Sequence, residues 1–314
     1  MFMKKELLTT VPDYYLNVGL NHFSPSQDTK PLDYWYATYV MKDQEFRRKI
    51  KPNPNMNGGN AVQGDKQREI TKQDGEVITI PGFGVGGYIF EHFTKQQAIE
   101  SAIEYMQDYQ RLYTDRDLEH FHEVIKRIPV SVTNLIKAFD SEKIFEQGEM
   151  TTETYVEYQH DDIEIVTIGR TDLATPKYIY EVKTKWFKKG KVKKDGTQGF
   201  TSASIPKQPD FAHLMQVALY WKATGIDTKI IYATGNKEDD WIIYDKENCE
   251  AMEHHKLQEY IDYARRTQLV RQNLLKLSDN PGDIAKYIQP DFSSFYYNNL
   301  NKEQMKEITD LWNI

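Results

Sequence analysis

The sequence contains a single cysteine, Cys249, among 314 residues. One thiol cannot form an internal disulfide, and it cannot supply a cysteine-ligated zinc site or the four ligands of an iron–sulfur cluster. The chain also lacks any run of about eighteen apolar residues, and its N-terminal segment lacks the continuous apolar stretch of a secretory leader. These absences predict a protein of the reducing cytoplasm that has no iron–sulfur cluster and no membrane partner.

A large excess of charge of either sign is also lacking. With 40 lysines and arginines against 47 aspartates and glutamates, the formal net charge is −7, which argues against binding of polyanions by the whole surface. Positive charge is concentrated locally, because the segment from Glu181 to Asp210 contains eight lysines and only three acidic residues. Hydrophobic residues at 39% and aromatic residues at 13% predict a folded globular chain of one large domain or two smaller ones.

The N-terminal part of the chain is predicted to be largely helical. Apolar residues recur there at helical spacing, and glycines make residues 73–88 a predicted loop. The predicted helices cover residues 31–49, a segment from about Gly59 to Thr71, and 94–140, the last divided into three near Thr114 and at Pro129.

The pattern changes after residue 150, where β-branched and aromatic residues alternate with polar ones. The predicted strands are 152–158, 163–173 and 178–186, which form an antiparallel meander, and 228–235 with 240–245, which form a hairpin. Between these groups we expect a basic loop over 188–208 and then a helix that starts at Pro209 and ends before Gly225. Further helices are predicted at 249–277 and 301–312.

Three charged side chains are expected to meet on the second and third strands of the meander. Side chains alternate along a strand, so Glu181 and Lys183 share one face while Val182 points to the other. A tight turn at Thr175-Pro176 would pair Asp172 with Ile179, which lies on the face of Glu181. Two carboxylates suit Mg²⁺ or Mn²⁺, and a nearby lysine can orient or deprotonate a water molecule that attacks phosphorus. The alternative is a solvated strand face, because acids and lysines are common.

The helix predicted after the basic loop has apolar residues on nearly all sides, which implies burial. His213, Gln216 and Tyr220 form its one polar stripe. A buried helix keeps such groups only where they are hydrogen-bonded, either within the protein or to a ligand.

These elements together resemble the PD-(D/E)XK nuclease superfamily, in particular its RecB-like branch with the Cas4-type and mitochondrial-genome-maintenance-type exonucleases. The resemblance rests on three motifs in order: Gly169-Arg170-Thr171-Asp172, Glu181-Val182-Lys183, and Gln216 with Tyr220. It implies an α/β fold, a restriction-endonuclease-like core with a mixed sheet flanked by helices. It also implies a metal-dependent DNA hydrolase that leaves a 5′-phosphate and a 3′-hydroxyl.

The resemblance assigns a role to each motif residue. Asp172, Glu181 and the Val182 carbonyl would hold the metal, and Lys183 would serve the attacking water. Gln216 and Tyr220 would steady the site or the DNA, which makes them catalytic candidates together with Asp172, Glu181 and Lys183.

One upstream motif departs from the family pattern. The RecB-like branch has G-x-x-x-H on a helix, its histidine being a metal ligand, and here the stretch Gly59-Asn60-Ala61-Val62-Gln63 has glutamine in that place. A glutamine amide oxygen is a hard donor acceptable to Mg²⁺, and the alternative is a surface glutamine. Glu153 and His22 are further candidates, for which structural or solvated roles are the alternative.

Basic and aromatic residues predict a partner with phosphates and bases. Lysines suit phosphates and aromatic rings suit unpaired bases, so single-stranded DNA or DNA with a free end is the expected ligand. The predicted DNA-binding residues are Trp35, Arg47, Arg48, Arg170, Lys185, Lys188, Lys189 and Lys191. For the lysine run, the alternative is a solvated flexible loop.

We therefore expect a stand-alone exonuclease of DNA recombination, repair or replication, in the cytoplasm of a bacterium or of a phage-infected cell. A recombination protein or a single-strand-binding protein is a candidate partner. Residues 1–145 would form a largely helical region that covers the active site, and residues 146–314 the nuclease core with C-terminal helices. The alternatives are a structure-specific or restriction-like endonuclease and a catalytically inactive nucleic-acid-binding relative.

Overall fold

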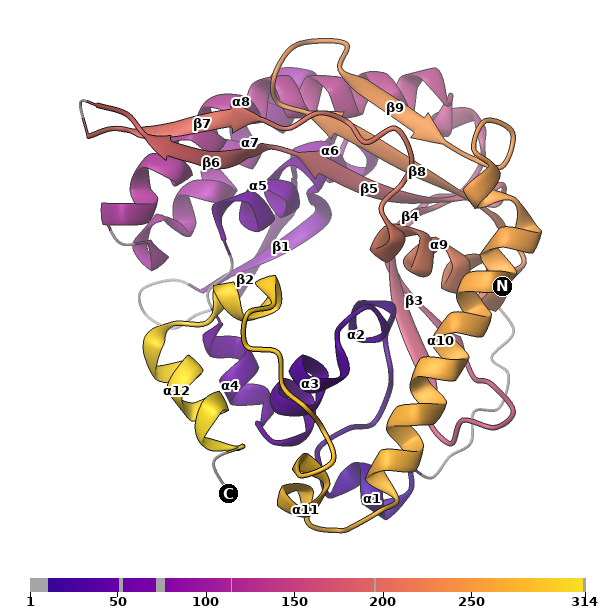
Figure 1. The fold of residues 1–314 in the computed structure, drawn as a ribbon. Coiled ribbons are helices and arrows are strands. Elements are labelled where there is room, and N and C mark those ends of the chain that lie inside the picture. The colour runs from indigo at the N-terminus through magenta and orange to yellow at the C-terminus, as the bar shows by residue number, and fades with distance from the viewer. Residues whose placement is uncertain (1–10, 51–52, 72–76, 114, 195, 313–314) are drawn as a thin grey trace.

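The computed structural model describes residues 11–50, 53–71, 77–113, 115–194 and 196–312. They form a mixed five-stranded sheet with helices on both faces (Figure 1). In spatial order its strands are β3 (Thr151–Tyr158), β4 (Thr167–Ala174), β5 (Tyr178–Lys185), β8 (Asp227–Thr234) and β9 (Trp241–Tyr244). Two antiparallel pairs lie outside this sheet: β1 (Asp65–Thr71) with β2 (Val77–Phe83), and β6 (Phe187–Val192) with β7 (Gln198–Ser202).

The helices of the N-terminal half are α1 (Asp13–Leu16), α2 (Pro25–Asp28), α3 (Leu32–Trp35), α4 (Gln44–Lys49), α5 (Pro54–Gln63), α6 (Gly84–Phe90), α7 (Lys95–Asp108) and α8 (Asp115–Ser141). Those of the C-terminal half are α9 (Phe211–Thr224), α10 (His254–Leu275), α11 (Pro281–Ala285) and α12 (Lys302–Asp310). Within the described residues, no helix has both the length and the apolar character needed to cross a membrane.

The predicted meander and hairpin are confirmed, since β3, β4 and β5 are antiparallel neighbours and β8 pairs antiparallel with β9. Helix α9 connects β5 to β8, which run parallel. The predicted pairing of Asp172 with Ile179 is wrong by two residues, because the register places Ala174 opposite Ile179 and Leu173 opposite Tyr180. A two-residue shift preserves the face of every side chain, so Asp172 still shares the face of Glu181.

Each face of the sheet packs against its own helices. Leu173 and Val182 belong to an apolar core that includes residues of α5 to α8, and Ile179 belongs to a second core with residues of α9 and α10. Glu181 lies two residues after Ile179, so its side chain points toward α9. Helix α9 ends as predicted, because Gly225 adopts the left-handed conformation that closes the helix. The N-cap of α9 is Asp210, so the helix begins two residues after the predicted start at Pro209.

Segments from the two ends of the chain form a common aromatic core (Figure 1). The predicted helix over 31–49 is confirmed in part: it is interrupted after α3 by a π-helical segment, Tyr36–Val40, and by Lys42 and Asp43 before α4. Tyr34 contacts Tyr297 edge-on, and the Tyr36 hydroxyl donates a hydrogen bond to the Pro281 carbonyl. Residues on both sides of the predicted boundary at 145 therefore pack in one cluster.

The helix predicted from Gly59 to Thr71 is confirmed only as far as Gln63, and the loop predicted over 73–88 is wrong for residues 77–88, while residues 72–76 lie outside the described part of the chain. The helix α5 begins at Pro54 and stops at Gln63, because Gly64 adopts φ = +66° and ends the helix. The chain then returns as the β1–β2 hairpin, in which Glu69 lies opposite Thr79 and Gln67 lies opposite Pro81. Strand β2 is followed directly by α6, which contains Gly84, Gly86 and Gly87.

Helix α8 is not interrupted at Pro129, contrary to the prediction. A proline inside a helix removes one hydrogen bond and costs about 3 kcal/mol. Packing offsets this cost, because Phe121, Val124, Ile128 and Leu135 on the same helix are fully buried. The predicted break near Thr114 agrees with the separate helices α7 and α8, and Thr114 itself lies outside the described residues.

The segment predicted as a basic loop contains the β6–β7 hairpin, which projects from the molecule in Figure 1. Phe187 and Phe200 on its two strands pack edge-on against each other, and His120 of α8 contacts both rings. These contacts anchor the base of the hairpin on α8, which the charged sequence does not indicate.

Candidate functional site

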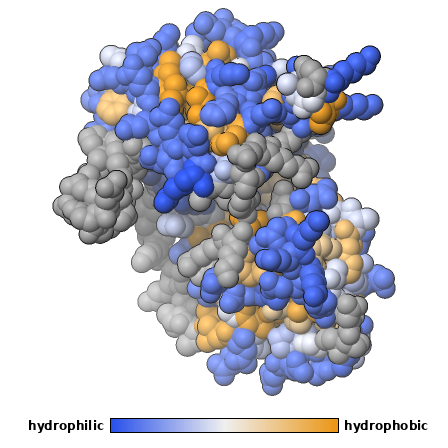
Figure 2. Space-filling view, turned by 90° about the vertical axis from the view of Figure 1, so that its left-hand side faces the viewer, coloured by the Kyte–Doolittle hydropathy of each residue, from blue (hydrophilic) through white to orange (hydrophobic). Residues whose placement is uncertain are grey.

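A cavity of about 700 Å³ lies between the end of α5, the strands β3 to β5, the middle of α9 and the start of α2 with the turn before it. Figure 2 shows the surface hollowed between the upper and lower parts of the molecule. The cavity lining contains all six predicted side chains of the catalytic and metal sites: Gln63, Asp172, Glu181, Lys183, Gln216 and Tyr220. The fold therefore brings together the residues that the sequence predicts to form one site.

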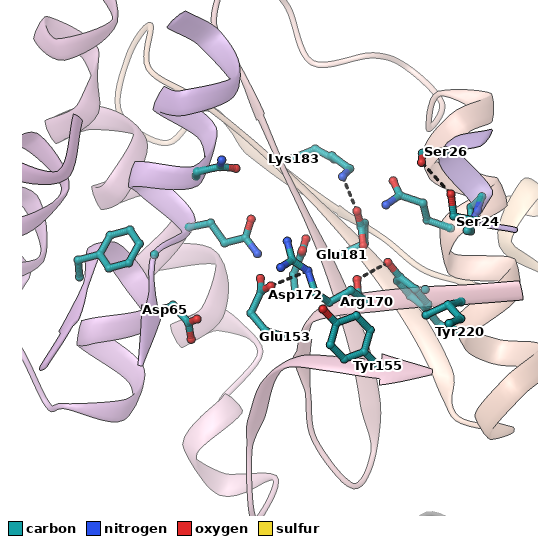
Figure 3. Close-up of a pocket in the computed structure, with 18 of the residues that line it drawn as sticks. Ser24, Ser26, Asp65, Glu153, Tyr155, Arg170, Asp172, Glu181, Lys183 and Tyr220 are labelled. Atoms are coloured by element: carbon teal, nitrogen blue, oxygen red, sulfur yellow. Dashed lines mark hydrogen bonds and ion pairs between the residues drawn. The ribbon is translucent and has the colours of Figure 1, made fainter. Parts of the chain in front are cut away.

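Asp172 lies near the end of β4, where β4 and β5 begin to diverge. Its Oδ2 atom accepts a hydrogen bond of 2.6 Å from the Val182 backbone N–H. The regular β4–β5 ladder ends at Leu173, so the carboxylate takes the place of a strand partner. This bond fixes Asp172 beside the Glu181-Val182-Lys183 segment (Figure 3).

Glu181 is buried in the middle of β5 with only 1% of its surface exposed. Both carboxylate oxygens are buried, and one forms an ion pair with Lys183. Burial raises the pKa of Glu181 to about 7, the Asp172 carboxylate adds to this rise, and Lys183 opposes it. A buried carboxylate beside a second carboxylate is costly, which marks this position as one that a cation can complete.

Lys183 extends from β5 toward the carboxylates (Figure 3). Burial lowers its pKa, but the charges of Glu181 and Asp172 raise it by more, so the pKa lies above the usual lysine value. Lys183 is therefore an ammonium ion at neutral pH, a hydrogen-bond donor rather than a base.

Gln216 and Tyr220 lie one turn apart on α9, above the strands. The Tyr220 hydroxyl donates a hydrogen bond of 2.7 Å to the Arg170 carbonyl. Burial raises the pKa of Tyr220 well above its usual value, and the charges of Glu181 and Asp172 add to the rise. Tyr220 thus remains neutral and ties α9 to the strand that carries Asp172.

Gly169 provides the space in which Tyr220 lies. A Cβ atom at this position would approach Leu219 and the Tyr220 ring to 2.8 Å each. The glycine of the G-x-x-D motif is therefore required by the close approach of α9 to β4.

We expect Gly169→Ala to lower the free energy of unfolding by about 1–3 kcal/mol, the usual cost of overpacking, and to reduce activity through displacement of Tyr220. Gly190→Ala is the matched control, because the nearest atom to its Cβ is at 3.4 Å. Urea denaturation of both variants provides the measurement. Equal stabilities of the two variants would contradict this account of Gly169.

Gln63 is the last residue of α5 and lines the cavity together with Asp172. The same two residues and Val182 also line a second, much smaller cavity. The orientation of this helix end depends on Gly64, because a Cβ there would overlap the Phe83 carbonyl at 1.8 Å. Gln63 therefore shares two cavities with Asp172, and its role at a metal stays a prediction.

Gln63→Ala is expected to raise the Mg²⁺ concentration needed for half-maximal activity and to reduce activity less than Asp172→Ala does, because a neutral amide binds a cation more weakly than a carboxylate. Gln67→Ala, on the exposed part of β1, is the control. Magnesium titrations of the two variants test this. An unchanged Mg²⁺ dependence in Gln63→Ala would leave Gln63 without a role at the metal.

The oxygen donors in the cavity fit a hard divalent cation. Asp172, the buried Glu181 carboxylate and the Gln63 amide supply the ligand type that Mg²⁺ and Mn²⁺ prefer. Among the described residues, His, Cys, Asp and Glu side chains form no group of three that could hold a metal ion. A metal at Asp172 and Glu181 would therefore need the Val182 carbonyl, the Gln63 amide or water as further ligands.

The predicted DNA-binding residues lie in different surroundings. Arg170 lines the cavity, Lys188 and Lys191 are exposed on β6, and Lys185 forms an ion pair of 2.5 Å with Asp210. The side chains of Arg48 and Lys189 lie outside the part of the chain that the structure describes.

Trp35 and Arg47 do not fit their predicted role. Trp35 is completely buried and its indole N–H donates to Gln27, so the prediction that it stacks on a base is wrong. Arg47 donates a hydrogen bond of 2.8 Å to the Thr38 carbonyl and lies over the Tyr39 ring. Arg47 is thus engaged inside the N-terminal helices and is absent from the cavity lining. Aromatic residues in that segment build a core, which composition alone does not reveal.

Several cavity residues were not predicted as site residues. Asp65 accepts a hydrogen bond from Thr152, and Phe83 stacks on Tyr105 with ring centroids 4.3 Å apart. The helix-ending Gly64 was the signal that could have placed Asp65 here. Glu153, expected to be structural or solvated, also lines the cavity.

No family model matches the sequence, and no curated protein matches it. Among solved structures, the chain is similar to a protein from Eubacterium rectale named "Putative exonuclease", with 13% identity, coverage of 96% of this chain and 95% of that chain, and a TM-score of 0.46. It is also similar to the protein SSO0001, with 16% identity, coverage of 52% of this chain and 70% of that chain, and a TM-score of 0.26. Both likenesses are weak, so the function must be argued from the cavity itself.

Proposed function

We propose that the chain is a metal-dependent nuclease that hydrolyses DNA phosphodiester bonds, with a PD-(D/E)XK core of the RecB-like type. The observation that carries the proposal is the buried Glu181 carboxylate, in the same cavity as a second carboxylate, Asp172, and the Lys183 ammonium that pairs with it. Protein interiors rarely retain two adjacent carboxylates outside a functional site.

Asp172, Glu181, the Val182 carbonyl and Gln63 would hold Mg²⁺ or Mn²⁺. When bound, such a cation supplies Lewis-acid stabilisation of negative charge on the phosphate oxygens. Lys183, charged at neutral pH because of its two carboxylate neighbours, would orient the attacking water and stabilise the same charge. The water oxygen adds to phosphorus, the bond to the 3′ oxygen breaks, and that oxygen takes a proton, which leaves a 5′-phosphate and a 3′-hydroxyl.

We further propose that the enzyme acts from free ends and prefers single strands. The cavity lies between the sheet and the N-terminal segments, a position that would admit a flexible strand more readily than a rigid duplex. Exposed Lys188 and Lys191 on the β6–β7 hairpin are suited to backbone phosphates outside the cavity.

Digestion of end-labelled linear DNA and of circular DNA, each single- and double-stranded, in Mg²⁺ tests this proposal. We expect linear single strands to be degraded and circular single strands to persist. Protein carrying Asp172→Asn, prepared in parallel, controls for contaminating nucleases. Circular single strands cut as fast as linear ones would favour the endonuclease alternative, and inactivity on every substrate would favour a nucleic-acid-binding relative.

A further inference from the structure

Glu153 has an unusual backbone conformation at the edge of the cavity. Its φ is +51°, in the left-handed region that residues other than glycine rarely adopt. The β3–β4 register pairs Thr152 with Leu173 and Thr154 with Thr171. Glu153 and Asp172 lie opposite each other between these pairs but are not themselves paired. A strained residue opposite a predicted catalytic carboxylate indicates a role in the site rather than in the sheet.

The Glu153 side chain forms an ion pair of 2.6 Å with the Arg170 guanidinium (Figure 3). The arginine side chain is 58% exposed and the glutamate side chain 26% exposed. Arg170 projects from a fixed point, because its carbonyl accepts the hydrogen bond from buried Tyr220. The guanidinium is thus accessible from the cavity while its backbone is held in place.

Glu153 lies in negative surroundings. Burial raises its pKa, the Asp172 and Asp65 carboxylates raise it further, and Arg170 opposes them. The ion pair with Arg170 is therefore the favourable interaction that holds a third carboxylate close to two others.

We propose that the Glu153 carboxylate binds the Arg170 guanidinium in the free protein, and that a DNA phosphate displaces this carboxylate when the strand binds. The proposal rests on the proposed function, since it takes DNA as the ligand. A guanidinium donates to carboxylate and phosphate oxygens through the same N–H groups, so the two anions compete for the Nε edge of Arg170 that Glu153 contacts. Glu153 thereby lowers the affinity for the strand and keeps Arg170 oriented toward the cavity in its absence.

Binding of a fluorescent single-stranded oligonucleotide, measured by anisotropy in EDTA so that no turnover occurs, tests this competition. Glu153→Gln is expected to bind about 5–10-fold more tightly than the wild type, and Arg170→Gln more weakly. The double variant should bind as weakly as Arg170→Gln alone, because the effect of Glu153 acts through Arg170. The slope of log affinity against log salt should become shallower by about 0.7 in Arg170→Gln, as expected for the loss of one phosphate contact.

Asp65→Asn is the matched control, because it removes one negative charge from the same cavity at a carboxylate that is bonded to Thr152. We expect less than a twofold gain from it. Glu153→Gly is a second test variant, since glycine adopts the positive φ without strain and removes the carboxylate; it should bind as tightly as Glu153→Gln.

A gain that persists without Arg170, or an equal gain in Asp65→Asn, would mean simple charge removal and would overturn the competition. Tight binding by the wild type with no gain in either Glu153 variant would also overturn it, and would leave the proposed function standing. Failure of the wild type and of every variant to bind the oligonucleotide would contradict the proposed function together with this inference.

Discussion

Asp172→Asn and Lys183→Ala are each expected to reduce the rate of DNA hydrolysis about a thousandfold or more, equivalent to about 4 kcal/mol of transition-state stabilisation. Asparagine keeps an oxygen that can accept the Val182 N–H bond, so the loss in Asp172→Asn reports the missing charge. Alanine at 183 removes the ammonium beside the reacting phosphate. Single-turnover rates with excess enzyme on linear single strands are the measurement.

Two control variants separate chemistry from general effects of charge. Asp161→Asn, in the turn between β3 and β4, and Lys237→Ala, in the turn between β8 and β9, change the same residue types at exposed positions. Both should retain nearly full activity. Circular dichroism and thermal melting should show that the inactive variants are folded, although Lys183→Ala leaves Glu181 without its ion-pair partner and is expected to melt at a lower temperature. Hydrolysis at the wild-type rate by folded Asp172→Asn would show that the site lies elsewhere.

The strand pattern of the C-terminal half could be predicted from sequence because each strand has its own periodicity and turn. β-Branched and aromatic residues alternate along β3 to β5, and Gly225 ends α9. The convergence of Asp172 with Glu181 was predicted from an incorrect register. The conclusion survived because a shift of two residues keeps side chains on the same face, whereas a shift of one would have reversed it.

The errors in the N-terminal half have a common physical origin, which is that tertiary packing outweighs local preference. Pro129 remains inside α8 because the burial of that helix offsets the cost of the proline. The hairpin β1–β2 pairs the mostly charged and polar β1, a weak strand former, with the β-branched run at the start of β2, a strand signal that the predicted loop overlooks. Trp35 is conspicuous in the sequence as an aromatic residue near basic ones, but it packs under Arg271, whose guanidinium lies 4.6 Å from its ring.

Glu153 illustrates a limit of a different kind. Nothing in the letters Thr-Glu-Thr indicates a positive φ, because glutamate is an ordinary residue on a strand. Its place at the cavity depends on the local distortion of the β3–β4 ladder opposite Asp172. The site motifs could be identified from the sequence, whereas the position of Glu153 opposite Asp172 could be found only from the three-dimensional structure.

Removal of divalent cations is expected to abolish hydrolysis completely. The argument starts from Glu181, which is buried beside the Asp172 carboxylate and whose pKa is raised by burial to about 7. A cation bound by Asp172 and Glu181 would neutralise two charges that repel each other, so activity should require Mg²⁺ or Mn²⁺ and should be lost in excess EDTA. Ca²⁺ should bind but support little turnover, because its looser coordination fits the reaction poorly.

Thermal melting gives a readout of this site that does not depend on activity. Mg²⁺ at ten times its dissociation constant should stabilise the wild type by about 1.4 kcal/mol, which corresponds to a rise of about 2–4 °C in Tm. Asp172→Asn should lose most of this rise, since it removes one of the two charges that bind the cation, while Asp161→Asn should keep it. Full hydrolysis in EDTA, or an equal rise in Tm for Asp172→Asn and the wild type, would rule out a metal at these carboxylates. In that case Lys183 and the ordered Asp172 carboxylate would have to act on phosphate without a cation, which would leave the two adjacent carboxylates to repel the substrate.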